Sequence, residues 1–272
     1  MSNRIQETFA TLKNSGKMAF MPFITAADPD LEGTKDAIRT LAAADVDLIE
    51  IGFPYSDPVA DGPVIQASYT RALAKKITVD QIFTALAELK SESIPPLVAM
   101  VSYAIIFRTG VDAFLDHCVQ SGIAGLIVPD LPGAEADDLF ERTQSRGLCL
   151  VQLIAPTTPR SRVKQVLARG SGFVYIVAVA GTTGERESVA SSLLEQLEWL
   201  REEADLPLAV GFGISRPEHV DPLRNRAQGV IVGTAIVRFL EKMEENGDRD
   251  AVLGELKTFA ESMSHAAHQT AS

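Results

Sequence analysis

The chain has 272 residues, of which 46% are hydrophobic and 22% charged, so it can bury a large core and is neither disordered nor collagen-like. Its 25 basic and 36 acidic residues give a net charge of −11, which disfavours nucleic acid and anionic membrane surfaces as partners. The N-terminal segment lacks a signal-peptide core, no apolar run is long enough to cross a bilayer, and the two cysteines have no CxxC spacing. We therefore expect a cytoplasmic protein with two reduced thiols.

Short apolar runs alternate along the chain with longer amphipathic segments, a pattern typical of repeated strand and helix units. Most of the runs are apolar at successive positions, as expected for parallel strands that are covered on both faces. The eight expected strands span residues 19–25, 47–52, 97–101, 124–128, 148–153, 173–179, 207–211 and 229–233. Helical spacing is visible in residues 31–44, 111–121, 134–146 and 189–203, and a further helix is expected around residues 64–74.

Two pairs of residues have the spacing of a capping box and predict helix starts, Thr78 with Gln81 and Ser215 with Glu218. Eight units in 272 residues give about 34 residues each, which suits a closed barrel. We expect one domain over residues 1–272, a single (β/α)8 TIM barrel with an extra N-terminal helix at about 1–16 and a flexible tail at about 264–272. An open doubly wound sheet is the alternative, which the missing GxGxxG motif after the first strand disfavours.

The active site of such a barrel lies where the strands end, so residues at those positions are the candidates. Glu50 is a carboxylate within an otherwise apolar strand. If Glu50 points into the barrel, burial raises its pKa and makes it suitable as a general acid and base. A glutamate paired against a helix fits the sequence equally well.

The loop after this strand, residues 53–63, contains three prolines and two aspartates, Asp57 and Asp61. Two carboxylates in different environments could share acid, base and electrostatic roles with Glu50. Capping of the loop and of the following helix is the alternative, and the sequence favours it for Asp57.

Glycines follow the last two expected strands and predict a phosphate site. Gly211, Phe212 and Gly213 follow the seventh strand, while Gly233 and Thr234 follow the eighth and open a helix. Glycines allow close approach of a ligand to the backbone, and a helix N-terminus offers free N–H groups.

Residues 180–188 contain two glycines and two threonines and could close over a ligand, although a solvated loop explains them as well. Tyr175, within the sixth strand, could hydrogen-bond a substrate or belong to the core. No lysine lies at the end of an expected strand and no histidine lies at the mouth, which excludes a Schiff-base aldolase and a histidine metal site. The remaining candidate chemistry is proton transfer by carboxylates on a phosphorylated small molecule.

The string LIEIGFPYSDPVADGPVIQ, residues 48–66, resembles the signature of the tryptophan synthase alpha subunit family around its catalytic glutamate. The segments PFITAADP, VPDLP, TTG, GFGIS and GTA extend the resemblance over nearly the whole chain. It implies a (β/α)8 lyase of tryptophan biosynthesis that cleaves indole-3-glycerol phosphate into indole and glyceraldehyde 3-phosphate by a retro-aldol reaction. It also implies no cofactor in this chain and an α2β2 assembly with a beta subunit that holds pyridoxal phosphate and receives the indole.

The resemblance also assigns roles to residues. Glu50 resembles the acid and base that protonates C3 of the indole and deprotonates the glycerol hydroxyl, and Asp61 resembles the carboxylate that binds the indole N–H. Pro54 and Asp57 would face the beta subunit. The residues implied around the substrate are Phe23, Ile65, Tyr175, Thr183, Gly184, Gly211, Phe212, Gly213, Gly233 and Thr234.

Residues 101–106 depart from the family pattern, because the Tyr-Asn-Pro found in many relatives is missing, and the shape of this rim is not predicted. Two other functions stay open, an autonomous indole-3-glycerol-phosphate lyase and a subunit that mainly binds and activates its partner. Indole-glycerol-phosphate synthase is a further alternative, disfavoured because no lysine lies at a strand end.

Overall fold

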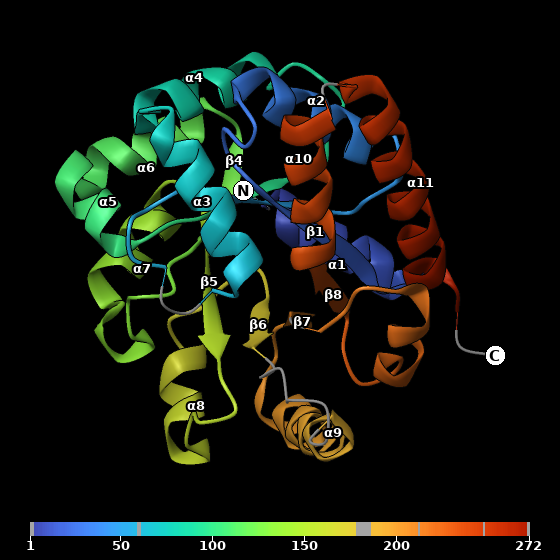
Figure 1. Ribbon diagram of the computed structural model, residues 1–272. Coiled ribbons are helices and arrows are strands. Elements are labelled where there is room, and N and C mark those ends of the chain that lie inside the picture. Colours follow the sequence, from blue (N-terminus) through green and yellow to red (C-terminus); the bar gives the residue numbers. More distant parts are fainter. Residues whose placement is uncertain (1–2, 59–60, 178–185, 212, 247, 271–272) are drawn as a thin grey trace.

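The computed structural model describes residues 3–58, 61–177, 186–211, 213–246 and 248–270. Eight parallel strands close into a barrel in the order β1 to β8, so the prediction of a (β/α)8 TIM barrel is confirmed. Helices surround the barrel on the outside (Figure 1). The strands are β1 (Ala19–Thr25), β2 (Ile49–Gly52), β3 (Leu97–Met100), β4 (Ile123–Ile127), β5 (Cys149–Ile154), β6 (Val174–Val177), β7 (Leu208–Gly211) and β8 (Gly229–Val232).

The helices predicted from apolar spacing lie close to their expected positions, and the structure adds others, among them the long C-terminal helix α11. The α-helices are α1 (Arg4–Asn14), α2 (Leu31–Ala42), α3 (Pro63–Ala74), α4 (Val79–Glu88), α5 (Tyr103–Thr109), α6 (Val111–Gln120), α7 (Asp137–Ser145), α8 (Arg160–Leu167), α9 (Arg186–Glu203), α10 (Thr234–Asn246) and α11 (Arg249–His268). The part of the chain that the structure describes also contains the 3-10 turns η1 (Gly133–Glu135), η2 (Pro217–His219) and η3 (Asp221–Leu223).

The apolar core has two parts, because successive side chains of a strand point to opposite faces. In β1, Met21 and Phe23 belong to the cluster inside the barrel, while Phe20 and Ile24 pack between the barrel and the helices. In β2, Ile49 and Ile51 belong to the outer cluster. Buried apolar area is the main stabilising contribution to such a fold.

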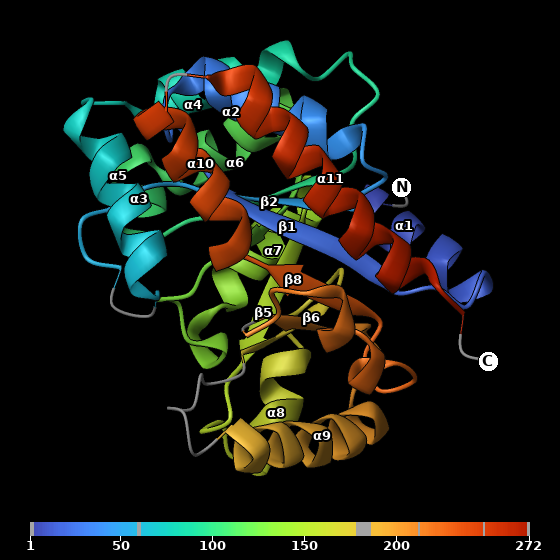
Figure 2. The ribbon, with the colours of Figure 1, turned by 45° about the vertical axis from the view of Figure 1, so that its right-hand side comes forward.

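Helix α1 packs against the inner cluster at the end of the barrel where the strands begin. Its apolar residues Ile5 and Phe9 are buried there, and the ring of Phe9 lies 5.6 Å from that of Phe173, just before β6. The side-chain amide of Asn3 donates to the carbonyl of Gly147 at 2.7 Å, just before β5. Figure 2 shows the chain turning from the end of α1 into β1. Helix α1 therefore covers the end of the barrel where the strands begin, and the end where the strands finish is the place for a functional site.

Local capping signals have mixed outcomes. Thr78 caps α4 in a capping box with Gln81, as predicted. The prediction of a helix started by Ser215 is wrong, because residues 217–219 form only the 3-10 turn η2, in which Pro217 is the first residue. The Ser215 N–H bonds to Nδ1 of His219 instead.

The rim after β3, whose shape the sequence leaves open, is the start of α5. The hydroxyl of Ser102 accepts from the Ala104 N–H. It also donates to Asp130 at 2.6 Å, and the other oxygen of Asp130 accepts the Tyr103 N–H at 2.7 Å. This rim is therefore a capped helix, held by an aspartate from the loop after β4.

The C-terminal segment differs from the expected tail. Residues 264–268 belong to α11, and Ser264 and Ala267 are buried. The Ser264 hydroxyl donates to the carbonyl of Ala44 at 2.9 Å, and the ring of His268 lies 2.9 Å from Asp47. These partners lie more than 200 residues away in sequence and hold the segment in place.

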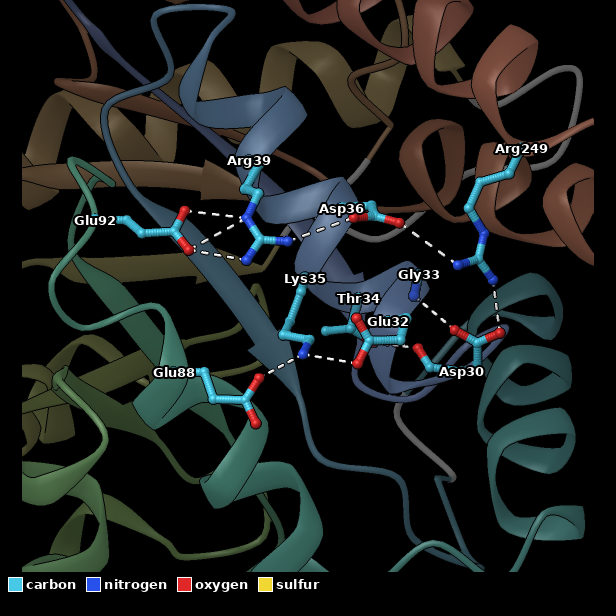
Figure 3. A network of polar contacts seen from close by, with 10 residues as sticks. All are labelled: Asp30, Glu32, Gly33, Thr34, Lys35, Asp36, Arg39, Glu88, Glu92 and Arg249. Carbon is cyan, nitrogen blue, oxygen red and sulfur yellow. Dashed lines mark hydrogen bonds and ion pairs between the residues drawn. The ribbon is translucent and has the colours of Figure 1, made fainter.

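Ion pairs connect α2 to the helices beside it (Figure 3). The ammonium of Lys35 lies 2.7 Å from Glu32 in the same helix and 2.5 Å from Glu88 of α4. Arg249 of α11 contacts Asp30, the residue that caps α2, at 2.6 Å. This network fixes three outer helices relative to one another.

A second network connects the loop after β1 to α3, and it predicts a large effect on stability. Asp28 is fully buried and forms a two-fold contact with Arg71 of α3, at 3.0 and 2.7 Å. Because removing Arg71 leaves a buried carboxylate without its cation, we expect Arg71→Met to lower the free energy of unfolding by about 2–4 kcal/mol in urea titrations. The control is Arg142→Met, which breaks exposed pairs and should cost under about 1 kcal/mol. Equal effects of the two changes would contradict this reasoning.

Candidate active site

Glu50 lies inside the barrel near the end of β2. Its neighbours Ile49 and Ile51 face the outer cluster, so Glu50 takes the inward position, and it is only 3% exposed. Burial and the nearby charge of Asp61 raise its pKa to about 8. Its Oε1 atom has no hydrogen-bond partner among the described residues. Glu50 is therefore a buried carboxyl group that is mostly protonated at neutral pH.

Asp61 lies directly before α3, which begins with Pro63. Burial raises the pKa of Asp61 to about 6, and the hydroxyl of Tyr55 offsets part of this rise. The pKa of Asp61 thus lies below that of Glu50. Near pH 7 the pair consists of an ionised Asp61 beside a protonated Glu50, which is the division of roles that two carboxylates need for acid–base work.

A cavity of about 380 Å³ opens beside Asp61 at the mouth of the barrel. Asp61 is the one charged side chain among the described residues that line it. Tyr175 lines the cavity next to Gly211. A side chain at Gly211 would collide with the ring of Tyr175, so only a glycine leaves room for the tyrosine here. The further apolar lining comes from Ile65, Met100, Leu153, Val177, Ile214 and Ile231. Such a wall suits a flat apolar group.

The far wall of the same cavity contains the two glycine turns. Gly213 has a φ of +76°, a conformation that favours glycine, and Gly233 precedes Thr234, the first residue of α10. The first N–H groups of a helix have no partners within the helix and carry its positive dipole end. This wall can receive a phosphate group without a lysine or an arginine.

A second cavity, of about 690 Å³, lies outside the barrel mouth. Pro54, Tyr55 and Asp57 line it from the loop after β2, and Arg108 and Asp130 line it from α5 and the loop after β4. Pro54 is buried, whereas Asp57 is exposed and accepts the Ser56 hydroxyl at 2.8 Å. Pro54 and Asp57 therefore line a different cavity from the one beside Asp61.

The structure brings most of the expected substrate residues together. Phe23 is buried inside the barrel, where its backbone pairs with Glu50 in the β1–β2 register. The residues that line the inner cavity as expected are Asp61, Ile65, Tyr175, Gly211, Gly213, Gly233 and Thr234. Thr183, Gly184 and Phe212 lie outside the described residues.

The described parts of the chain contain no cluster of three or more potential metal ligands. Within the same residues, no helix combines the length and the apolar character needed to cross a membrane. Cys118 and Cys149 are both free and buried. Burial raises the pKa of Cys118 far above its usual range, so this thiol is a poor nucleophile.

Two tyrosines beside the carboxylates do not follow from the sequence patterns. Tyr55 contacts Tyr69 with ring centroids 5.4 Å apart, and the charge of Asp61 raises the pKa of both, although burial contributes more. For Tyr69, helical spacing could have indicated burial, because Ser68, Tyr69 and Ala72 form the buried face of α3. Spacing alone does not say that a buried phenol lies beside a carboxylate.

The family model described as "Tryptophan synthase alpha chain" matches residues 9–268 of the chain. The tryptophan synthase alpha chain of a Picosynechococcus species is 42% identical over 263 residues, covering 96% of this chain and 98% of that protein. That of Gloeobacter violaceus is 45% identical over 238 residues, covering 87% of this chain and 86% of that protein.

Among solved structures, tryptophan synthase subunit alpha from Legionella pneumophila aligns with a TM-score of 0.89 at 33% identity, covering 98% of this chain and 99% of that one. The family model, the relatives and the solved structure all point to the same family. The chain belongs to the tryptophan synthase alpha chain family.

Proposed function

We propose that Glu50 and Asp61 are the residues of this chain that carry out its retro-aldol reaction, the cleavage of indole-3-glycerol phosphate to indole and glyceraldehyde 3-phosphate. The observation that carries the proposal is the buried Glu50 carboxyl, which has a pKa of about 8 and an unpartnered oxygen beside an ionisable Asp61. A protonated carboxyl can give its proton to C3 of the indole, and the resulting carboxylate can then take the proton of the adjacent glycerol hydroxyl.

The bonds balance in this scheme. When the hydroxyl loses its proton to Glu50, the carbon–carbon bond to C3 breaks, its electron pair returns to the indole ring, and the aldehyde forms. Glu50 ends as it began, protonated. Asp61, ionised, accepts the indole N–H and stabilises the positive charge that the ring carries after protonation.

The inner cavity suits the rest of the substrate. Its apolar wall, with Ile65 and Tyr175, would hold the indole, and Phe23 lies buried beside Glu50. The turns at Gly213, Gly233 and Thr234 would bind the phosphate through backbone N–H groups. We assign Gly211, Phe212, Thr183 and Gly184 to the same substrate site, by the family resemblance of their segments.

The two pKa values predict a bell-shaped pH dependence of kcat/KM. Asp61 must be ionised, so activity should fall as the pH drops below about 6, where Asp61 becomes protonated. Glu50 must be protonated, so activity should also fall as the pH rises above about 8. The measurement is kcat/KM for indole formation between pH 5 and pH 10, because this quantity reports groups of the free enzyme. A profile that stays flat from pH 5 to pH 10 would exclude this pair as the acid and the base.

The family implies a beta subunit as partner, and the pyridoxal phosphate of the complete enzyme belongs to that subunit. We propose an α2β2 assembly in the cytoplasm, with Pro54 and Asp57 on the face toward the beta subunit. Support comes from the outer cavity, whose lining combines these residues with Arg108 and Asp130 outside the catalytic pair.

One experiment separates the remaining functions. The chain is assayed for indole release from indole-3-glycerol phosphate alone and with a tryptophan synthase beta subunit. Slow release alone that rises at least tenfold with the beta subunit supports the alpha subunit of a synthase. Fast indole release that the beta subunit does not change supports an autonomous lyase. No indole release, either alone or with the beta subunit, supports a subunit that mainly binds and activates its partner.

A further inference from the structure

Tyr69 is a buried phenol whose hydroxyl has no hydrogen-bond partner among the described residues, although the side chain is only 1% exposed. Glu50 has an unpartnered buried oxygen of its own, Oε1. Buried polar groups are nearly always paired, because an unpaired one loses its hydrogen bond to water without replacement. Two such atoms at one site suggest that each gains its partner at another stage of the reaction.

The two groups face the same space inside the barrel. Glu50 and Gly52 occupy successive inward positions of β2, roughly 7 Å apart along the strand. A Cβ atom at Gly52 would lie 2.8 Å from the Tyr69 hydroxyl and 2.5 Å from the ring of Phe23. Gly52 thus leaves room for the phenol at the inward position of β2 that follows Glu50.

The surroundings keep the phenol protonated, so it can act only as a neutral donor or acceptor. Burial raises the pKa of Tyr69 well above its usual value, and Asp61, Tyr55, Glu50 and Tyr175 raise it further. These four come from β2, the loop after it, and β6, and both carboxylates lie close enough to act on the phenol.

We propose that Tyr69 is a positioning residue for the reaction, and that its hydroxyl donates a hydrogen bond to the Glu50 carboxylate at the step in which Glu50 has given up its proton. The inference rests on the proposed role of Glu50. In the resting chain Glu50 is neutral, so its carboxyl group carries no charge for the hydroxyl to stabilise. Once C3 of the indole is protonated, a bare carboxylate exists in a buried site, where a hydrogen bond to a charged group is at its strongest.

The test is Tyr69→Phe, which removes one hydroxyl and keeps the ring. We expect kcat to fall about tenfold with KM within about twofold, because the donor acts on a charge that is present only after binding. The alkaline limb of the kcat profile should move up by about one pH unit, because the ionised form of Glu50 loses its donor. The melting temperature should not fall, because the lost hydroxyl had no partner.

Two variants make the result interpretable. Tyr103→Phe removes a phenolic hydroxyl from α5, outside the group of residues around the carboxylates, and should leave kcat of the isolated chain unchanged. Glu50→Gln tests the proposed function itself, and full activity in that variant would remove the basis of both claims. If Glu50→Gln is inactive while Tyr69→Phe keeps its kcat and its pH profile, the inference about Tyr69 alone is overturned. A fall in kcat accompanied by lower stability and an unmoved alkaline limb would also overturn it, in favour of a structural role.

Discussion

Glu50→Gln should lower kcat for indole formation by about a thousandfold or more while the chain stays folded. An amide can neither give a proton to C3 nor take one from the glycerol hydroxyl, so both functions of the group disappear, and one positioned acid or base contributes about 10²–10⁴-fold. Glutamine has nearly the same shape and carries no charge, as does the protonated Glu50 of the resting structure.

Because no hydrogen bond of Oε1 is lost, the free energy of unfolding should stay within about 1 kcal/mol of the unchanged chain. The measurements are indole release under saturating substrate and urea unfolding of the same preparation. Glu218→Gln, an exposed change in η2, is the matched control and should behave as the unchanged chain. If Glu50→Gln retained full activity, Glu50 would not be the acid and base.

Asp61→Asn should lower kcat/KM by about a hundredfold or more. In the proposed role the carboxylate accepts the indole N–H and stabilises the positive charge of the protonated ring. The amide is neutral, and loss of one electrostatic contact of this kind costs about 10²–10³-fold. The change also removes the charge that raises the pKa of Glu50, so the alkaline limb of the residual activity should move to lower pH.

The loss of the electrostatic contact lowers kcat/KM, and the loss of the charge beside Glu50 moves the alkaline limb of the pH profile. Both are measured in one series of kcat/KM values against pH. Asp80→Asn, an exposed change in the first turn of α4, is the control. A normal rate in Asp61→Asn would exclude an electrostatic role for this carboxylate. A reduced rate with the alkaline limb unmoved would mean that the two carboxylates do not interact.

Much of the architecture could be predicted from the sequence, because strands and helices have different apolar periods. All eight strands lie within two residues of their expected bounds at every boundary that the structure describes, and β1 has the expected bounds at both ends. The orientation of Glu50 could not be predicted in this way. The run of apolar residues around it identifies the strand, but when both faces of a strand are covered, periodicity does not say which face is the barrel interior.

The wrong predictions concern contacts between distant residues. The expected helix start at Ser215 follows a local pattern, yet η2 and η3 both contain proline at their first or second residue, and only short turns form. The segment expected as a flexible tail has no strong local signal for a helix, but Ser264 and His268 contact Ala44 and Asp47 in the segment after α2. Local propensity is a weak prior, and tertiary contacts override it.

The net charge of −11 and the expected phosphate ligand are compatible for a structural reason. The wall formed by Gly213, Gly233 and Thr234 offers backbone N–H groups, which carry no formal charge and do not appear in a sum of side chains. Net charge speaks against polyanions that cover a large surface, and it says little about one small anion in a pocket.

We propose above that the buried Glu50 and the half-buried Asp61 cleave indole-3-glycerol phosphate. The most direct measurement is a product analysis, in which the chain and its Glu50→Gln variant are each incubated with the substrate at pH 7 and all indole and triose products are quantified. We expect indole and glyceraldehyde 3-phosphate in equal amounts from the unchanged chain and neither above background from the variant. Equal yields from both proteins, or a different indole product from the unchanged chain, would contradict it.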